Sequence, residues 1–182
     1  MYSAIAANKR NTVLIIGAFV ALLGGISIWW GYSSGNGSSA LFIIGFVLLY
    51  TIFQYYMAGA IAVAMTGAVQ IQKSDNPRLW RIVENLSITE GVPMPKVYIM
   101  DNPQPNAFAT GRNPENAAVA ATTGLLSMLG REEVEGVMAH ELAHVKNRDT
   151  LIMTMVATIA GALSMLANFG LFFRGNDRNG LA

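Results

Sequence analysis

The chain contains two histidines, and both lie in the pentapeptide His140-Glu141-Leu142-Ala143-His144. On a helix, residues four apart project from one face, about 6 Å apart along the axis. Neutral imidazole is a common ligand of zinc, so the pair predicts a Zn²⁺ site. Glu141 points elsewhere and could take a proton from a zinc-bound water, whose pKa zinc lowers to about 7. This H-E-x-x-H spacing is typical of zinc-dependent peptide hydrolysis, with Glu141 as general base.

A catalytic zinc site of this type has three protein ligands, and the sequence supplies two obvious ones. There is no third histidine, and residues 151–176 contain no carboxylate. Asp149, five residues after His144, is better placed to orient an imidazole than to bind the metal. We therefore expect the third ligand outside these 182 residues, in a protein of which this chain is a truncated part. The alternative is a catalytically incompetent membrane scaffold or partner-binding fragment.

The segment that carries the histidines has the pattern of a helix from Arg131 to Asp149. Its apolar residues fall on one stripe when plotted at 100° per residue: Val134, Val137, Met138, Leu142 and Val145. The two histidines fall on a different face. This separation argues against a pair of buried core histidines.

Residues 69–150 have the composition of a folded domain outside the membrane. A second helix is predicted to begin at Pro77, after a capping Asp or Asn, and to end at Gly91. Short strands are predicted at residues 96–100, 107–110 and 117–122. Helices and a small sheet together predict an α+β metallopeptidase domain.

The remainder of the chain is apolar. Hydrophobic residues make up 53% of it and charged residues 13%, and residues 11–72 carry no Lys, Arg, Asp or Glu. Three apolar runs, residues 13–30, 40–68 and 151–173, are long enough to cross a membrane as helices. Lys9 and Arg10 precede the first run and Lys73 follows the second, so the positive-inside rule places the N-terminus and the middle domain in the cytoplasm.

Composition also excludes several classes of function. The net charge of +1 provides no broad basic surface for nucleic acid, and the absence of cysteine excludes disulfides and thiol catalysis. The predicted organisation is a membrane region (1–68), a metallopeptidase domain (69–150), a third span (151–173) and a short tail (174–182). The fold class is therefore mostly α, with three transmembrane helices.

Several segments together resemble the HtpX family of bacterial membrane-bound zinc metallopeptidases: I-A-A-N-K-R (5–10), P-N-A-F-A-T-G-R-N-P (105–114), V-A-A-T-T-G-L-L (119–126) and R-E-E-V-E-G-V-M-A-H-E-L-A-H-V-K-N-R-D (131–149). The resemblance implies a zincin-like domain, His140 and His144 as zinc ligands, and Glu141 as the catalytic carboxylate. It also implies a fourth span and a cytoplasmic C-terminal part that supplies a glutamate ligand. The implied role is quality control of misfolded and membrane polypeptides at the bacterial cytoplasmic membrane. No oligomeric state is indicated.

In enzymes similar to this family, an edge strand beside the metal-binding helix pairs with extended substrate. The predicted strand with small side chains is the candidate here: Ala117, Ala118, Val119, Ala120 and Ala121. A purely structural strand is the alternative of equal weight.

Overall fold

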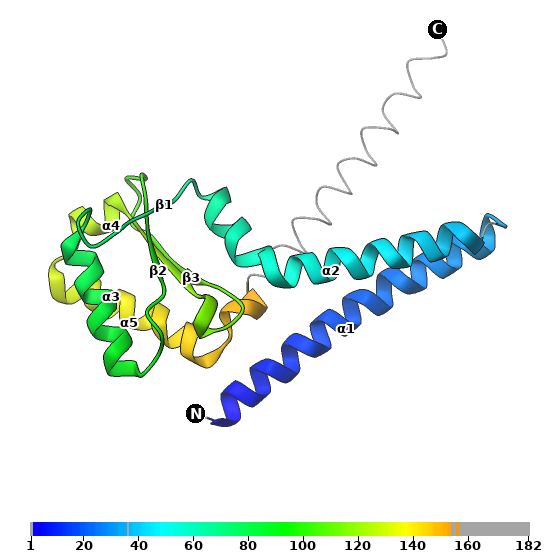
Figure 1. Ribbon diagram of the computed structural model, residues 1–182, viewed down its shortest axis with the longest axis horizontal. Coiled ribbons are helices and arrows are strands. Elements are labelled where there is room, and N and C mark those ends of the chain that lie inside the picture. The colour runs from blue at the N-terminus through cyan, green and yellow to red at the C-terminus, as the bar shows by residue number, and fades with distance from the viewer. Residues whose placement is uncertain (1, 36, 154–155, 157–182) are drawn as a thin grey trace, which may run out of the picture.

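The computed structural model describes residues 2–35, 37–153 and 156. Two long helices, α1 (Tyr2–Ser33) and α2 (Gly37–Met65), run antiparallel beside each other and extend away from a small domain (Figure 1). Both are long and apolar enough to cross a membrane, over Ile5–Ser33 and Ala40–Met65. Most of the third predicted span, residues 151–173, and the tail, residues 174–182, lie outside the described residues.

The small domain contains one four-stranded sheet. Its strands are β1 (Val69–Gln70), β2 (Lys96–Met100), β3 (Ala107–Thr110) and β4 (Ala118–Thr122). They are arranged in the order β1-β2-β4-β3, with β2 and β4 parallel and the two outer pairs antiparallel. The three longer strands match the predicted ones within a residue, whereas β1 was not predicted. The 3-10 turn η1 (Pro114–Asn116) lies between β3 and β4.

The prediction of an edge strand at residues 117–121 is wrong. β4 is hydrogen-bonded to β2 on one side and to β3 on the other, and all its residues are buried. Its small side chains fit a crowded interior position, not an open channel. The edge strand on this side of the sheet is β3.

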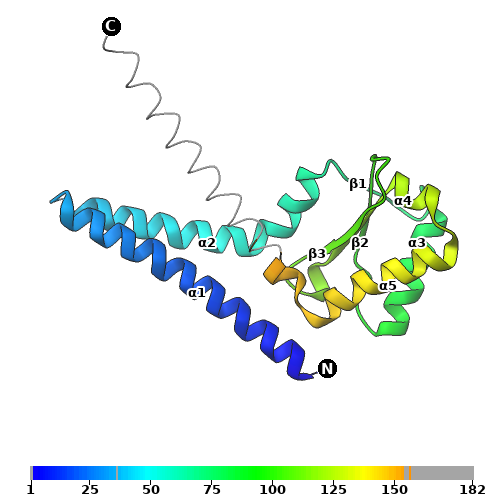
Figure 2. The same cartoon turned by 180° about the vertical axis from the view of Figure 1, so that it is seen from behind.

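Two helices, α3 (Pro77–Glu90) and α5 (Arg131–Asn147), pack against each other and together with the sheet form the core (Figure 2). The predicted limits of α3 are confirmed: the Asn76 side chain accepts a hydrogen bond from the Leu79 N–H at 3.0 Å, and Gly91 ends the helix with φ of 65°. A short helix, α4 (Thr123–Met128), follows β4 and was not predicted.

The core lies between these helices and one face of the sheet. Its most buried members come from α3, β2, β4 and α5: Leu79, Ile82, Val83, Val97, Val119, Val134 and Met138. The buried stripe of α5 is therefore close to the one predicted. Because that stripe is anchored in the core, the opposite side of α5 is held at a fixed angle, and this side carries the histidines.

Candidate metal centre

Both ends of α5 are fixed by local contacts. At the start, the Glu133 carboxylate accepts a hydrogen bond from the Gly130 N–H at 2.7 Å. At the end, Arg148 adopts a left-handed conformation with φ of 58°, which stops the helix and turns the chain. This turn returns the next residue, Asp149, toward the last turn of the helix.

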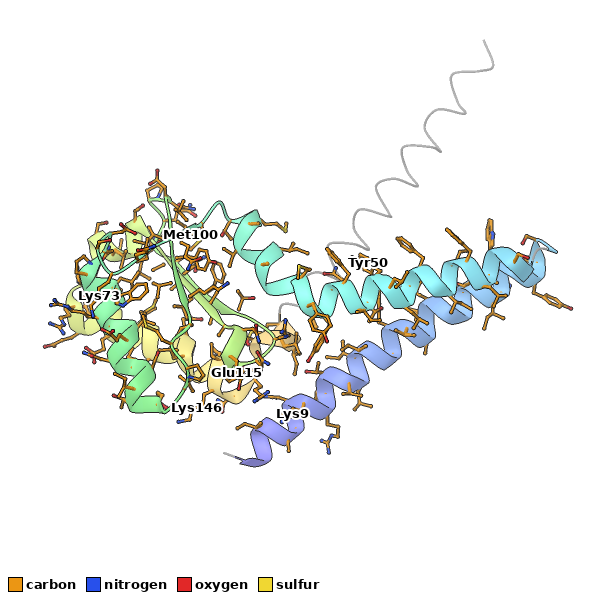
Figure 3. All side chains as sticks on the ribbon, viewed as in Figure 1. Lys9, Tyr50, Lys73, Met100, Glu115 and Lys146 are labelled. Atoms are coloured by element: carbon orange, nitrogen blue, oxygen red, sulfur yellow. The ribbon has the colours of Figure 1, made fainter. Side chains whose placement is uncertain are left out.

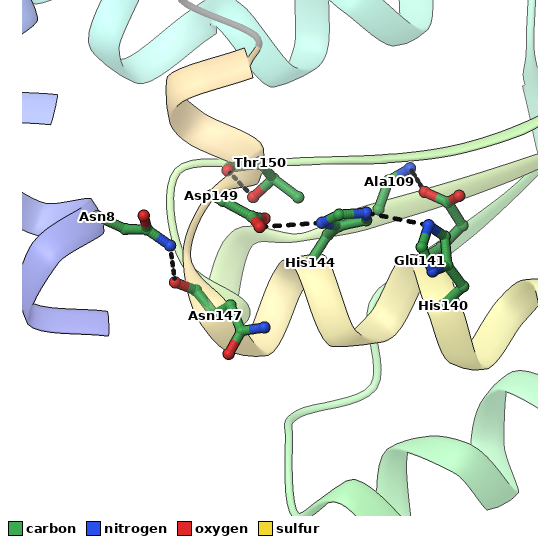
Figure 4. A network of polar contacts seen from close by, with 9 residues as sticks. Asn8, Ala109, His140, Glu141, His144, Asn147, Asp149 and Thr150 are labelled. Atoms are coloured by element: carbon green, nitrogen blue, oxygen red, sulfur yellow. Dashed lines mark hydrogen bonds and ion pairs between the residues drawn. The ribbon is translucent and has the colours of Figure 1, made fainter. Parts of the chain in front are cut away.

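The two imidazoles meet at their Nε2 atoms. The Nε2 of His140 and the Nε2 of His144 lie 3.2 Å apart, and the rings are nearly perpendicular, at 84° (Figure 4). Two nitrogens bound to one tetrahedral zinc at 2.0–2.1 Å would be about 3.3 Å apart. The pair therefore fits a single zinc ion, with both Nε2 atoms as ligands.

The Asp149 carboxylate contacts the His144 ring at the nitrogen that does not face His140. Its Oδ2 lies 2.9 Å from the Nδ1 of His144, and the two side chains are about a quarter exposed, at 25% and 29%. A proton on Nδ1 donated to this carboxylate leaves Nε2 free to bind a metal. Asp149 thus occupies the orienting position that its spacing predicted.

Glu141 lies toward the sheet. Its Oε2 accepts a hydrogen bond from the backbone N–H of Ala109, on β3, at 2.9 Å (Figure 4). Since the Ala109 N–H bonds Glu141, it is not used in the ladder with β4 and points to the outer edge of β3. The carboxylate therefore lies against β3, an edge strand of the described sheet that packs on α5.

Sequence reasoning missed two contacts that tie the end of α5 to the rest of the molecule. The Asn8 side-chain amide on α1 donates to the Asn147 carbonyl at 2.9 Å, and the Thr150 hydroxyl donates to the Gly111 carbonyl at 3.0 Å (Figure 4). Asn8 lies in the I-A-A-N-K-R segment, yet nothing in that pattern indicates a partner 139 residues away. Through Asn8, the N-terminal helix contacts the helix that carries the histidines.

The third ligand stays a prediction. Within the part of the chain that the structure describes, no group of three or more His, Cys, Asp or Glu side chains is placed to hold a metal ion. The described residues supply two imidazoles whose spacing fits one zinc ion, one carboxylate that contacts His144 and one carboxylate near the edge of β3.

Comparisons with known proteins identify the family of this chain. The model of Peptidase family M48 matches residues 73–181, more than half of the chain. Two proteins named "Protease HtpX homolog", from Tropheryma whipplei strains Twist and TW08/27, are each 49% identical over 183 residues. The alignment covers 99% of this chain and 62% of each relative, so the chain spans about three fifths of their length.

One solved structure, titled "Crystal Structure of S. mikatae Ste24p", has a TM-score of 0.49 and 19% identity; the match covers 91% of this chain and 37% of that one. The predicted resemblance to HtpX-type peptidases is confirmed by the family match and by the identity over nearly the full chain. The chain belongs to peptidase family M48.

Proposed function

We propose that this chain forms part of a membrane-anchored zinc metalloendopeptidase that hydrolyses misfolded or membrane polypeptides at the cytoplasmic face of the bacterial membrane. The observation that carries the proposal is the 3.2 Å approach of the two Nε2 atoms with Glu141 beside them on the same helix. The relatives' names and the two membrane-capable helices support it. Since the chain spans 62% of the length of those relatives, its proteolytic activity and its substrates are part of what we propose.

Each residue of the site has a role in this chemistry. His140 and His144 would hold the metal, and Asp149 keeps the Nε2 of His144 available for it. Zinc bound there supplies a polarising charge that acidifies water and activates a carbonyl. The Glu141 carboxylate would accept a proton and deliver it to the leaving amine. The third protein ligand would come from outside the described residues.

The outer edge of β3 is the surface on which we expect an extended peptide to bind. This edge takes the role that the sequence had assigned to β4, because β3 lies at an edge of the described sheet and packs on α5, whereas β4 is paired on both sides. Pairing through backbone atoms gives affinity with little dependence on side chains, as broad specificity requires. The Ala109 N–H is held by Glu141, so a substrate carbonyl that pairs there must displace this contact.

Orientation follows from the charges that flank the two helices. Lys9 and Arg10 lie near the start of α1, and Lys73 and Arg78 follow α2. The positive-inside rule therefore favours a cytoplasmic domain and N-terminus.

The test is zinc content and proteolysis, in detergent, by this chain extended to the full length of its relatives, so that a third ligand is present. We expect one zinc per molecule and cleavage of casein. Glu141→Gln should keep the zinc but reduce cleavage by about 10²–10⁴-fold, because it cannot transfer protons. Glu135→Gln is the matched control, since Glu135 lies exposed on the same helix. Cleavage by Glu141→Gln at the rate of the unchanged chain would contradict the proposal.

The second candidate is a non-catalytic membrane scaffold, which is favoured by the presence of two metal ligands instead of three among the described residues. It predicts weak zinc binding that never reaches one ion per chain, and no cleavage of casein. This result would assign the scaffold role to the chain and leave hydrolysis to a protein that supplies a third ligand.

A further inference from the structure

A cavity of about 390 Å³ lies between α2 and the small domain, away from the imidazole pair. One wall is formed by residues 55–60 of α2, and the other includes Lys96 and Tyr98 of β2 with Arg112 and Glu115 of the β3–β4 connection. No residue of α5 lines it. The alternation of β2 explains the separation, because Lys96 and Tyr98 face the cavity while Val97 between them is buried in the core.

The lining carries more positive than negative charge. It includes two cations, Lys96 and Arg112, and one carboxylate, Glu115. Among the described residues, no carboxylate lies within ion-pair distance of either cation. The Arg112 guanidinium lies 4.8 Å from the centre of the Tyr56 ring, which holds it against α2 and leaves its N–H groups available. A forked guanidinium and an ammonium that line one cavity are suited to bind phosphate oxygens.

The cavity lies at the depth expected for lipid headgroups. Counted from Ala40, where the membrane-capable part of α2 begins, a rise of about 30 Å ends near Ala60, and this rise equals the thickness of the hydrocarbon core. Tyr55 and Tyr56 then come at the level where tyrosines typically mark the membrane interface. Beyond them α2 bends toward β1 (Figure 1), and Glu115 lies on the side of the domain turned toward the membrane helices (Figure 3).

We propose that this cavity binds the phosphate of an anionic glycerophospholipid, with Arg112 and Lys96 as the phosphate-binding side chains. The bilayer places phosphodiesters at this level, and the excess positive charge favours a headgroup with net negative charge over a zwitterionic one. The acyl chains would lie along the apolar surface of α2, where Leu49, Ile52 and Phe53 are exposed. The proposal depends neither on zinc nor on peptide hydrolysis.

The test is a lipid titration of the purified chain in detergent, followed by native mass spectrometry. The probes are phosphatidylglycerol, phosphatidylcholine and inorganic phosphate. We expect phosphatidylglycerol to bind at least about tenfold more tightly than phosphatidylcholine, and the double variant Lys96→Gln, Arg112→Gln to lose about tenfold or more of that affinity. Glu115→Gln should bind phosphatidylglycerol more tightly, because it removes the repelling carboxylate from the lining.

The matched control is the double variant Lys73→Gln, Arg81→Gln, which removes the same charge from exposed positions outside the cavity. It should keep the affinity of the unchanged chain. The proposal is overturned if the cavity variant binds phosphatidylglycerol as the unchanged chain does while retaining its circular dichroism spectrum, or if the control loses as much. Inorganic phosphate that binds as tightly as phosphatidylglycerol would assign the cavity to free phosphate and also overturn it.

Discussion

If His140 and His144 hold zinc as proposed, the contact between Asp149 and His144 should strengthen the zinc affinity. Loss of a hydrogen-bonding partner behind a zinc-binding histidine costs about 10–100-fold in metal affinity, or about 1.4–2.7 kcal/mol. The two side chains are 25% and 29% exposed, so water competes for the contact and partly screens it. We therefore expect Asp149→Ala to weaken zinc binding by about tenfold, at the lower end of this range.

A competition titration against a chromogenic zinc chelator measures this effect. Asp149→Asn should lose less affinity than Asp149→Ala, because the amide oxygen can still accept the proton on Nδ1 of His144. Glu135→Ala removes an exposed carboxylate from the same helix and should leave zinc affinity unchanged. Equal zinc affinity of Asp149→Ala and the unchanged chain would refute the orienting role, provided that both fold.

Substitutions at three further positions test the packing of the domain, with thermal or chemical unfolding in detergent as the measurement. Asn8→Ala should lower the free energy of unfolding by about 1 kcal/mol, because it removes the hydrogen bond to the Asn147 carbonyl. Asn8→Asp should lower it by a similar amount, because a carboxylate cannot donate to that carbonyl; full stability of Asn8→Asp would argue against the contact. Leu142→Ala should lower the free energy of unfolding by about 2–5 kcal/mol, because the Leu142 side chain is fully buried. A decrease below about 1 kcal/mol would contradict its core position. Gly124→Ala should destabilise strongly, because the alanine Cβ would collide with the Pro103 carbonyl oxygen; an unchanged unfolding midpoint would refute that close approach.

Local signals predicted much of the fold. The cap at Asn76, the left-handed Gly91 and the apolar stripe of α5 each act within one or two helical turns, so their patterns are visible in the sequence. The same holds for the imidazole pair, because a spacing of four residues fixes the relative placement of two side chains on a helix. Asp149 was also predictable, since it lies five residues from its partner.

Long-range pairing could not be predicted in the same way. Periodicity indicates that a strand exists but not which strands neighbour it, and β4 proved to be central while β3 lies at the edge. The hydrogen bond from Asn8 to the Asn147 carbonyl and the approach of Gly59 to Gly111, where a Cβ would lie 3.3 Å from the Gly111 Cα, depend on how α1 and α2 meet the domain. These contacts are set by tertiary packing and leave no local pattern.

The most direct test of the zinc centre is X-ray absorption at the zinc edge of the loaded chain. The geometry predicts scattering from two imidazoles with zinc–nitrogen distances of about 2.0–2.1 Å. His140→Ala and His144→Ala should each leave one imidazole in the spectrum and lower zinc affinity. A spectrum that shows no imidazole, or one that neither substitution changes, would contradict the account.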